Sequence, residues 1–267
     1  MIMKRPGFTL IELLVVIAVI ALLIALLVAV LRRSKQQALA VACNSNVRQL
    51  TMGMFMYEGE NGTFPFGFYN TFAEPPYGYF GSSTKDRMGW WWFHFMDGFY
   101  KKPNNKTSVI SCPSRQISSL TLRYNILYGN YGVNRSICKS SADIGLNEEE
   151  FAGKPLGSRD IPHPAKSLLI VDSGYTMVGW WHVTDAPPVV LNMSNAEDSA
   201  YVPGLEINKD KDLRPGQKED AIGGRHPNKT VNVGFVDGHS ERKKAIDLFI
   251  EKKDDTYTNK SPLWVPK

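Results

Sequence analysis

The sequence of 267 residues has none of the motifs that mark the common enzyme active sites. It contains no Gly-x-Ser-x-Gly elbow, no His-Glu-x-x-His helix and no glycine-rich phosphate loop, and its five histidines have no partner at a diagnostic spacing. The net charge of +5 is modest, and the basic residues are scattered among acidic ones instead of forming a stripe. These absences argue against an enzyme and against nucleic acid as a partner.

Charge is also scarce near the amino terminus. From Phe8 to Leu31 the only ionisable side chain is Glu12. At about 1.5 Å per residue this stretch can cross a hydrocarbon core of roughly 30 Å, so residues 8–31 are predicted to span a membrane as a helix. A cleaved secretory signal fits poorly, because basic residues and a continuing helical pattern follow where a small-residue cleavage site is needed. A charge in a membrane helix is costly, and Glu12 therefore indicates a function beyond anchoring.

The segment that leads into this helix reads Lys-Arg-Pro-Gly-Phe-Thr-Leu-Ile-Glu-Leu-Leu over residues 4–14. It resembles the class III leader of type IV pilins and type II secretion pseudopilins. The resemblance implies that residues 1–7 are a leader peptide, that prepilin peptidase cuts after Gly7, and that Phe8 becomes the methylated amino terminus. Cleavage creates a cationic amine at Phe8. The Glu12 carboxylate of a neighbouring helix can pair with that amine, so that neither charge is left bare in lipid.

Charge alone does not decide the orientation of the membrane helix. Lys4 and Arg5 precede it, but three basic residues within 32–35 follow it, so the positive-inside rule gives no clear answer. The resemblance implies a single-pass protein of the bacterial inner membrane with a cytoplasmic amino terminus and a periplasmic domain, exposed at the cell surface if it joins a pilus. It also implies three partners: prepilin peptidase, other pilin or pseudopilin subunits, and the secretion or pilus assembly platform.

Apolar residues continue at helical spacing beyond the membrane segment. Residues 32–60 are predicted to extend the same helix without a break, since Ala29 stands where many relatives have a kinking proline. The helix is expected to end near Gly59 and Gly62 and to lie against one globular domain of residues 61–267. The apolar stripe consists of Leu39, Cys43, Val47, Leu50, Met54 and Tyr57.

The remaining sequence predicts an α+β protein, in which the long helix packs on an antiparallel sheet. Residues 63–100, rich in aromatics, glycine and proline, favour turns and strands. Strands are predicted at 108–111, 166–172 and 230–236, and Asp237-Gly238 supplies a two-residue hairpin turn before a return strand at 239–243. Residues 143–151 are expected to hold a short helix, and 192–220 a polar surface loop.

Six short segments, spread over most of the chain, extend the resemblance. Their residues and their order are similar to those in the pseudopilin-like proteins of the prepilin-type processing-associated H-X9-DG domain family. The signature residues are His226, Asp237 and Gly238, although ten residues instead of nine separate His226 from Asp237. The six segments are 43–50, 62–65, 112–114, 131–134, 164–172 and 225–239.

No cofactor is expected, but two sets of side chains are candidate metal ligands. His226, Asp237 and His239 meet if the hairpin brings its ends together, and Asp172 is placed beside Asp237 if both lie at one strand end. Calcium is the cation to test, with Asp210 and Asp212 as a second pair. The structural interpretation is preferred, because Asp-Gly turns arise for backbone reasons alone.

The tryptophans suggest a different function. Trp90, Trp91, Trp92, Trp180 and Trp181 are candidates for a platform that stacks on sugar rings, with Trp91 and Trp181 as the proposed contacts. The protein would then be a membrane-anchored carbohydrate-binding or adhesive subunit. Adjacent residues of a strand alternate faces, however, so at least some of these rings are expected in the core.

Three cysteines, Cys43, Cys112 and Cys138, permit one disulfide and leave one thiol. A periplasmic domain would favour oxidation. The resembling family tends to keep cysteines at the positions of Cys43 and Cys112, which makes that bridge the preferred one. Cys112 with Cys138 is the main competitor.

Overall fold

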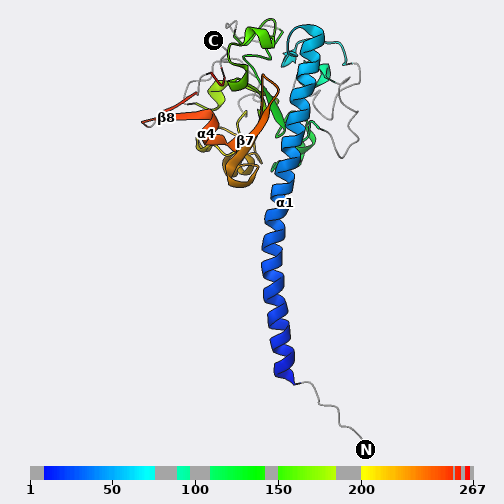
Figure 1. The fold of residues 1–267 in the computed structure, drawn as a ribbon, viewed down its shortest axis with the longest axis vertical. Coiled ribbons are helices and arrows are strands. Elements are labelled where there is room, and N and C mark those ends of the chain that lie inside the picture. Colours follow the sequence, from blue (N-terminus) through cyan, green and yellow to red (C-terminus); the bar gives the residue numbers. More distant parts are fainter. Residues whose placement is uncertain are drawn as a thin grey trace, which may run out of the picture.

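The computed structural model describes residues 9–75, 89–96, 109–141, 150–184, 200–254, 256–259 and 262–264. One helix, α1 (Leu10–Asn61), projects far beyond a globular head that the described residues after Asn61 build (Figure 1). We call its residues 10–31 the shaft. The unbroken helix confirms that the membrane segment and residues 32–60 form one element, and the leader residues 1–7 lie outside the described residues.

The conformation of Gly62 ends α1 at Asn61. Gly62 adopts φ 78°, in the left-handed region that glycine enters without steric cost, and its N–H donates to the carbonyl of Glu58 at 2.7 Å. This confirms the stop predicted from the glycines at 59 and 62.

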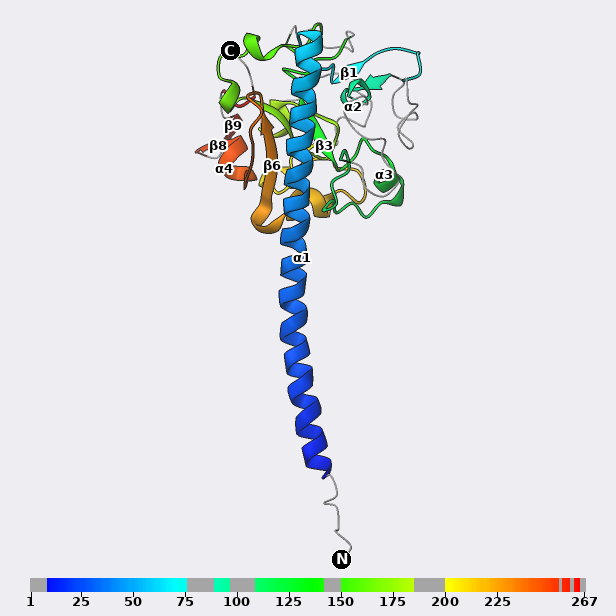
Figure 2. The ribbon, with the colours of Figure 1, turned by 45° about the vertical axis from the view of Figure 1, so that its right-hand side comes forward.

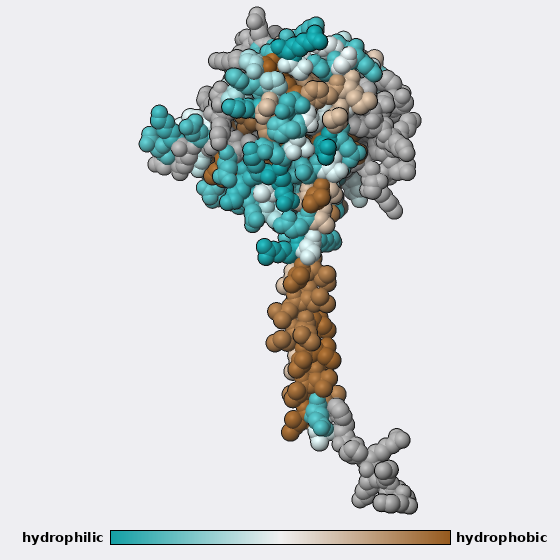
Figure 3. All heavy atoms as spheres, viewed as in Figure 1, coloured by the Kyte–Doolittle hydropathy of each residue, from teal (hydrophilic) through white to brown (hydrophobic). Residues whose placement is uncertain are grey.

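The two halves of α1 have different surroundings. The shaft is exposed and hydrophobic almost throughout (Figure 3). In the upper half the predicted stripe meets the head, and Cys43, Val47, Leu50 and Met54 are fully buried. Leu39 and Tyr57 at its ends are half-buried. Burying this stripe fixes the helix on the head through the hydrophobic effect.

A five-stranded sheet forms the centre of the head, and α1 packs across its β4, β6 and β7 strands (Figure 2). The strand order is β5-β3-β4-β6-β7. All neighbouring pairs are antiparallel except β3 with β5, so the sheet is mixed and not purely antiparallel. The strands are β3 (Tyr131–Asn134), β4 (Leu168–Asp172), β5 (Met177–Val178), β6 (Thr230–Phe235) and β7 (Ser240–Lys244).

Two small hairpins and several short helices complete the described chain. The predicted strand at 108–111 is wrong for residues 109–111, which form turns, and residue 108 lies outside the described residues. The short helix expected at 143–151 falls mostly on residues that are likewise outside them. The elements are β1 (Phe68–Tyr69), β2 (Trp90–Trp91), β8 (Ile250–Lys253), β9 (Thr256–Asn259), α2 (Trp92–Phe95), α3 (Leu120–Tyr124), α4 (Ala245–Phe249), the 3-10 helices Ser158–Asp160, Pro164–Lys166, Trp180–His182, Glu206–Lys209 and Pro227–Lys229, and the π-helix Glu219–Gly223.

The hairpin between β6 and β7 forms where it was predicted, with a different loop. Phe235 donates its N–H to the carbonyl of His239 at 2.9 Å, and Gly238 donates to Phe235 at 3.0 Å. Three residues, 236–238, therefore make the loop instead of two. Gly238 supplies the left-handed conformation, φ 93°, that three-residue hairpin loops need at this position.

The expectation of a surface loop at 192–220 is wrong for its described part, residues 200–220. Tyr201, Val202 and Leu205 are buried in the head. Side-chain hydrogen bonds link this part of the chain internally: Asn208, also buried, donates through Nδ2 to the carbonyls of Val202 and Ala221 at 2.8 Å each. Lack of periodicity therefore did not mean exposure, because internal hydrogen bonds replaced regular structure.

Gly234 in β6 allows α1 to approach the sheet closely. A Cβ at Gly234 would lie 2.0 Å from Oγ1 of Thr51 and 2.8 Å from Cγ2 of Ile170. We expect Gly234→Ala to destabilise the head by about 1–3 kcal/mol, since overpacking moves α1 or distorts β6. Urea unfolding of the detergent-solubilised chain measures this.

The control is Gly223→Ala, because a Cβ there meets nothing within 4 Å. Adding Thr51→Ala to Gly234→Ala should recover part of the lost stability, since it removes the nearest clashing atom. An unchanged urea midpoint for Gly234→Ala would show that α1 does not lie this close to β6.

Candidate functional site

The amino end of α1 is capped by Glu12 and Thr9. The Thr9 backbone N–H and hydroxyl both donate to Oε2 of Glu12 at 2.8 Å, and the Glu12 N–H donates to Oγ1 of Thr9 at 3.3 Å. This is a capping box, which satisfies helix N–H groups that have no partner within the helix. The Thr-x-x-Glu spacing is a sequence signature of this box, so this role of Glu12, which was not predicted above, could have been found from the sequence. Gly7 and Phe8, the predicted cleavage and methylation residues, lie outside the described residues.

The shaft can cross a membrane by length and composition. None of its 18 most apolar consecutive residues is buried in the head. Among the described residues, α1 is the helix that is long and apolar enough to span a membrane. An apolar surface of this size is stable only when lipid or other apolar helices cover it.

A second candidate site lies where α1 crosses the sheet. Cys43 of α1 and Cys112, which lies in an irregular segment, bring their Sγ atoms to 2.7 Å of each other. His226, just before β6, places Nε2 3.1 Å from Oδ2 of Asp172 at the end of β4. All four residues are buried. Each of the four is a candidate residue on sequence grounds, but no pattern in the sequence links the thiols to the histidine.

Asp172 is the centre of a buried polar network. Its Oδ2 accepts the backbone N–H of Asn232 at 2.6 Å as well as the His226 contact, and its Oδ1 lies 3.8 Å from Nη1 of Arg225. Arg225 also binds Asp220 through Nε at 3.0 Å and Nη2 at 2.5 Å. Two carboxylates thus face one guanidinium and one imidazole, which is the pairing that buried charges require.

The network shifts the protonation of its members. Burial disfavours the charged imidazole of His226, but the Asp172 carboxylate outweighs it and raises the pKa of His226 to about 9. Burial likewise opposes ionisation of Asp172, yet His226 and Arg225 hold the pKa of this carboxyl below its usual value. At neutral pH the pair is therefore an imidazolium and a carboxylate.

Cys43, Cys112 and His226 are the group of described residues that offers three potential metal-ligand atoms, all within 4.8 Å of one another. Two sulfurs bound to one tetrahedral zinc ion at 2.3 Å would stand about 3.8 Å apart. The observed 2.7 Å is too short for that arrangement. The geometry favours a sulfur–sulfur pair over a metal centre.

The predicted group of His226, Asp237 and His239 does not form. Asp237 and His239 contact each other in the exposed hairpin loop, where the His239 ring stacks on Phe235. Asp172 faces Asn232, near the opposite end of β6, so its predicted place beside Asp237 is also wrong. The antiparallel register explains this, because Leu168, and not Asp172, pairs with Phe235. Asp210 and Asp212 are exposed, and calcium binding by them stays a prediction.

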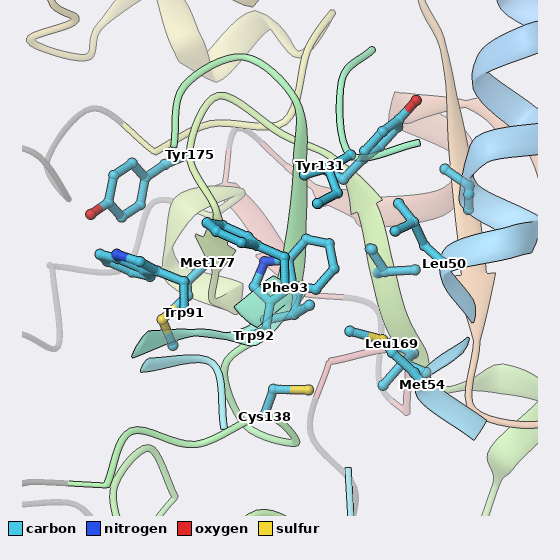
Figure 4. Packing of buried hydrophobic residues seen from close by; sticks show 14 of the residues in the cluster. Leu50, Met54, Trp91, Trp92, Phe93, Tyr131, Cys138, Leu169, Tyr175 and Met177 are labelled. Carbon is cyan, nitrogen blue, oxygen red and sulfur yellow. The ribbon is translucent and has the colours of Figure 1, made fainter. Parts of the chain in front are cut away.

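The tryptophan platform is wrong for its two proposed contacts. Trp91 is fully buried and Trp181 is 7% exposed. The expectation that at least some of these rings lie in the core is confirmed, because the rings of Trp91 and Trp92 both lie in it (Figure 4). Trp90 is half-buried and donates its Nε1–H to the carbonyl of Ala73 at 2.7 Å. The rings therefore stabilise the head instead of offering a sugar-binding surface.

Comparison with known protein families gives a match at the amino end of the chain. The family described as the prokaryotic N-terminal methylation motif matches residues 2–28. Among curated proteins and solved structures, none matches the chain. Together with the apolar shaft, the motif supports membrane anchoring and an amino terminus of the prepilin type. More particularly, it supports a pilin or pseudopilin subunit that prepilin peptidase processes.

Proposed function

We propose that this protein is a structural subunit, and not an enzyme, that assembles through α1 into a type II secretion-like or type IV pilus-like fibre. The observation that carries the proposal is the shaft: an exposed apolar half-helix that continues without a break into a half-helix packed on the head. Before assembly the membrane covers the shaft, and in the fibre the shafts of neighbouring subunits cover one another. The head then lies at the fibre surface and provides the specificity of the subunit.

Glu12 provides the second support. Both hydrogen bonds that Thr9 donates to the Glu12 side chain end on Oε2. Among the described residues, no group donates a hydrogen bond to the other carboxylate oxygen, Oε1. A neighbour's Phe8 amine, created by cleavage after Gly7, can therefore pair with this carboxylate while the capping box stays intact. Such a pair would set the axial register between subunits.

The finer parts of the proposal rest on the sequence resemblance. We place the leader in the cytoplasm and the head in the periplasm, or at the cell surface in a pilus. Prepilin peptidase, other pilin-like subunits and an assembly platform are the partners. We also assign the head to the H-X9-DG domain family, in which the signature histidine, here His226, would have a structural role.

Replacing Glu12 tests whether its charge directs assembly. Glu12→Gln keeps a capping-box residue but loses the charge, whereas Glu12→Ala loses both. We expect both variants to be cleaved and inserted, and both to be at least about tenfold depleted from the fibre, which corresponds to ~1.4 kcal/mol per subunit contact. Quantitative blotting of sheared fibres against membranes measures this ratio.

Glu12→Asp is the matched control, because it keeps the charge on a shorter side chain. If Glu12→Gln joins the fibre as the wild type does, capping alone accounts for the glutamate and the charge-pairing argument is wrong. If wild-type protein itself stays entirely in the membrane fraction of cells that build such fibres, the chain is an anchored protein that does not assemble.

A further inference from the structure

Two thiols and one imidazole meet at the junction between the membrane-bound helix and the head. Cys43 belongs to α1, Cys112 to the segment 109–119, which has no helix or strand, and His226 to the stretch before β6. The two cysteines are 69 positions apart in the chain, yet their sulfurs lie 2.7 Å apart. The proposed assembly uses none of these groups.

His226 is held with one ring nitrogen toward the thiols. Its Nε2 binds Asp172, and its side chain is inaccessible to solvent. Its Nδ1 is buried and has no hydrogen-bond partner among the described residues. The ligand atoms of His226, Cys43 and Cys112 all lie within 4.8 Å of one another. An unpaired buried N–H is costly, and beside two cysteines the natural partner of this imidazolium N–H is a thiolate sulfur.

We propose that Cys43 and Cys112 form a disulfide that joins α1 covalently to the head, and that the imidazolium of His226, oriented by Asp172, stabilises the Cys43 thiolate that starts this reaction. Cys43 is the attacking sulfur and Cys112 the resolving one. His226 and Asp172 are positioning residues, since the bond forms between the sulfurs alone.

The reaction is a thiol–disulfide exchange with an external disulfide, carried by a small molecule or by a second protein. The Cys43 thiolate, which the imidazolium of His226 stabilises, attacks one sulfur of the oxidant. The oxidant S–S bond breaks, its other sulfur leaves as a thiolate that takes a proton from solvent, and a mixed disulfide remains on Cys43. The Cys112 thiol then attacks Sγ of Cys43 and gives its proton to the second oxidant sulfur, which is released as a thiol. Two electrons pass from the cysteines to the oxidant.

Both sulfurs are buried, so an oxidant can reach them only after local opening. The segment 109–119 is the part that opens at least cost, because it has no helix or strand, whereas α1 and β6 hold the opposite side. Its movement takes Cys112 away and leaves Cys43 beside His226. When the segment closes again, Cys112 completes the bond, and burial then protects the disulfide from reduction.

The protonation of the cluster agrees with these roles. The pKa of Cys43 is lowered to about 5, chiefly by the hydrogen bond from Cys112 and further by His226, against the effects of burial and Asp172. Burial raises the pKa of Cys112 well above its usual value. The other groups that face the cluster are Arg225 and Tyr131, whose hydroxyl also has a raised pKa through burial. Cys43 is thus the thiolate and Cys112 the thiol that follows.

The first experiment maps the cysteines in the full chain extracted from membranes. The protein is denatured without reductant, alkylated and digested, and the peptides are identified by mass spectrometry. We expect alkylation of Cys138 alone, and a linked peptide pair containing Cys43 and Cys112. Alkylation of all three cysteines, or release of about one zinc ion per chain when the thiols are blocked, would overturn the proposal.

The second experiment tests His226. In a Cys112→Ser background oxidised glutathione should form a stable adduct on Cys43, and the adduct rate is measured against pH. We expect His226→Gln to move the midpoint of the profile to higher pH and to slow the reaction at pH 6 roughly three- to tenfold. His163→Gln, at an exposed histidine, should change nothing.

Asp172→Asn provides an independent test if His226→Gln does not fold. It leaves the imidazole in place but removes the charge that keeps it protonated. Loss of the imidazolium should outweigh the loss of repulsion between Asp172 and the Cys43 thiolate, so the midpoint should shift in the same direction. A pH profile that neither variant alters would show that His226 only packs against the sulfurs. Neither result depends on fibre assembly, so failure here leaves the proposed function untouched.

Discussion

Gly7→Val is expected to leave residues 1–7 attached and to keep the protein out of the fibre. The matched family motif covers this position, and the cleavage predicted there requires the peptidase to reach the bond between Gly7 and Phe8. A β-branched side chain beside that bond obstructs it, whereas glycine does not. We expect the cleavage rate to fall about tenfold or more, equivalent to ~1.4 kcal/mol in the barrier. Without cleavage no Phe8 amine exists to pair with Glu12.

Gly7→Ala is the matched control, since a methyl group is the smallest side chain that can be added. It should be cleaved faster than Gly7→Val, and the amount of each variant in the fibre should follow its cleaved fraction. If Gly7→Val is processed at the wild-type rate, the cleavage site lies elsewhere. If it is uncleaved yet joins the fibre, the amine of Phe8 has no part in assembly.

Arg225→Met should destabilise the head by roughly 3–5 kcal/mol, the usual cost of removing one member of a buried ion pair. The guanidinium is fully buried and faces Asp220 and Asp172. It also donates to the carbonyls of Asn130 at 2.7 Å and Ser173 at 3.1 Å. Methionine fills a similar volume but leaves two carboxylates and two carbonyls without this partner. Such a loss is a large part of the ~5–15 kcal/mol that stabilises a typical domain.

Tryptophan fluorescence during urea unfolding of the detergent-solubilised chain measures this loss, because Trp91 and Trp92 lie in the core. Arg159→Met, at an exposed arginine, should shift the midpoint little. Adding Asp220→Asn to Arg225→Met should recover part of the stability, since it removes one of the uncompensated charges. A variant as stable as the wild type would show that the arginine is not buried between these carboxylates.

Local patterns predicted the long elements of this fold well. The stripe from Cys43 to Met54 repeats with the helical period and predicted the upper half of α1. The alternating apolar residues Val231, Val233 and Phe235 predicted the strand β6. In α1 the periodicity records the burial of one face, so the pattern can be read without knowing the partner. Both faces of β6 are buried, and its alternation arises because polar Asn232 lies between the apolar residues. The three-residue loop after β6 differs from prediction because Asp-Gly fits more than one turn type.

The site could be predicted only in part. Resemblance favoured the pairing of Cys43 with Cys112, whose sulfurs the structure places together. The contact of His226 with Asp172 joins residues 54 positions apart and depends on how β4 and β6 are aligned, which no local pattern records. The burial of Trp91 could not be predicted, because alternation places Trp90 and Trp91 on opposite faces without saying which face is the core.

The central claim is that Gly7 and Phe8 define a processing site and that the mature protein begins with a modified phenylalanine. Mass spectrometry of the amino-terminal peptide from membrane-extracted protein tests it most directly. The account predicts a chain that begins at Phe8 and carries one methyl group on its amine. A mature chain that still begins at Met1 or Ile2 would contradict it.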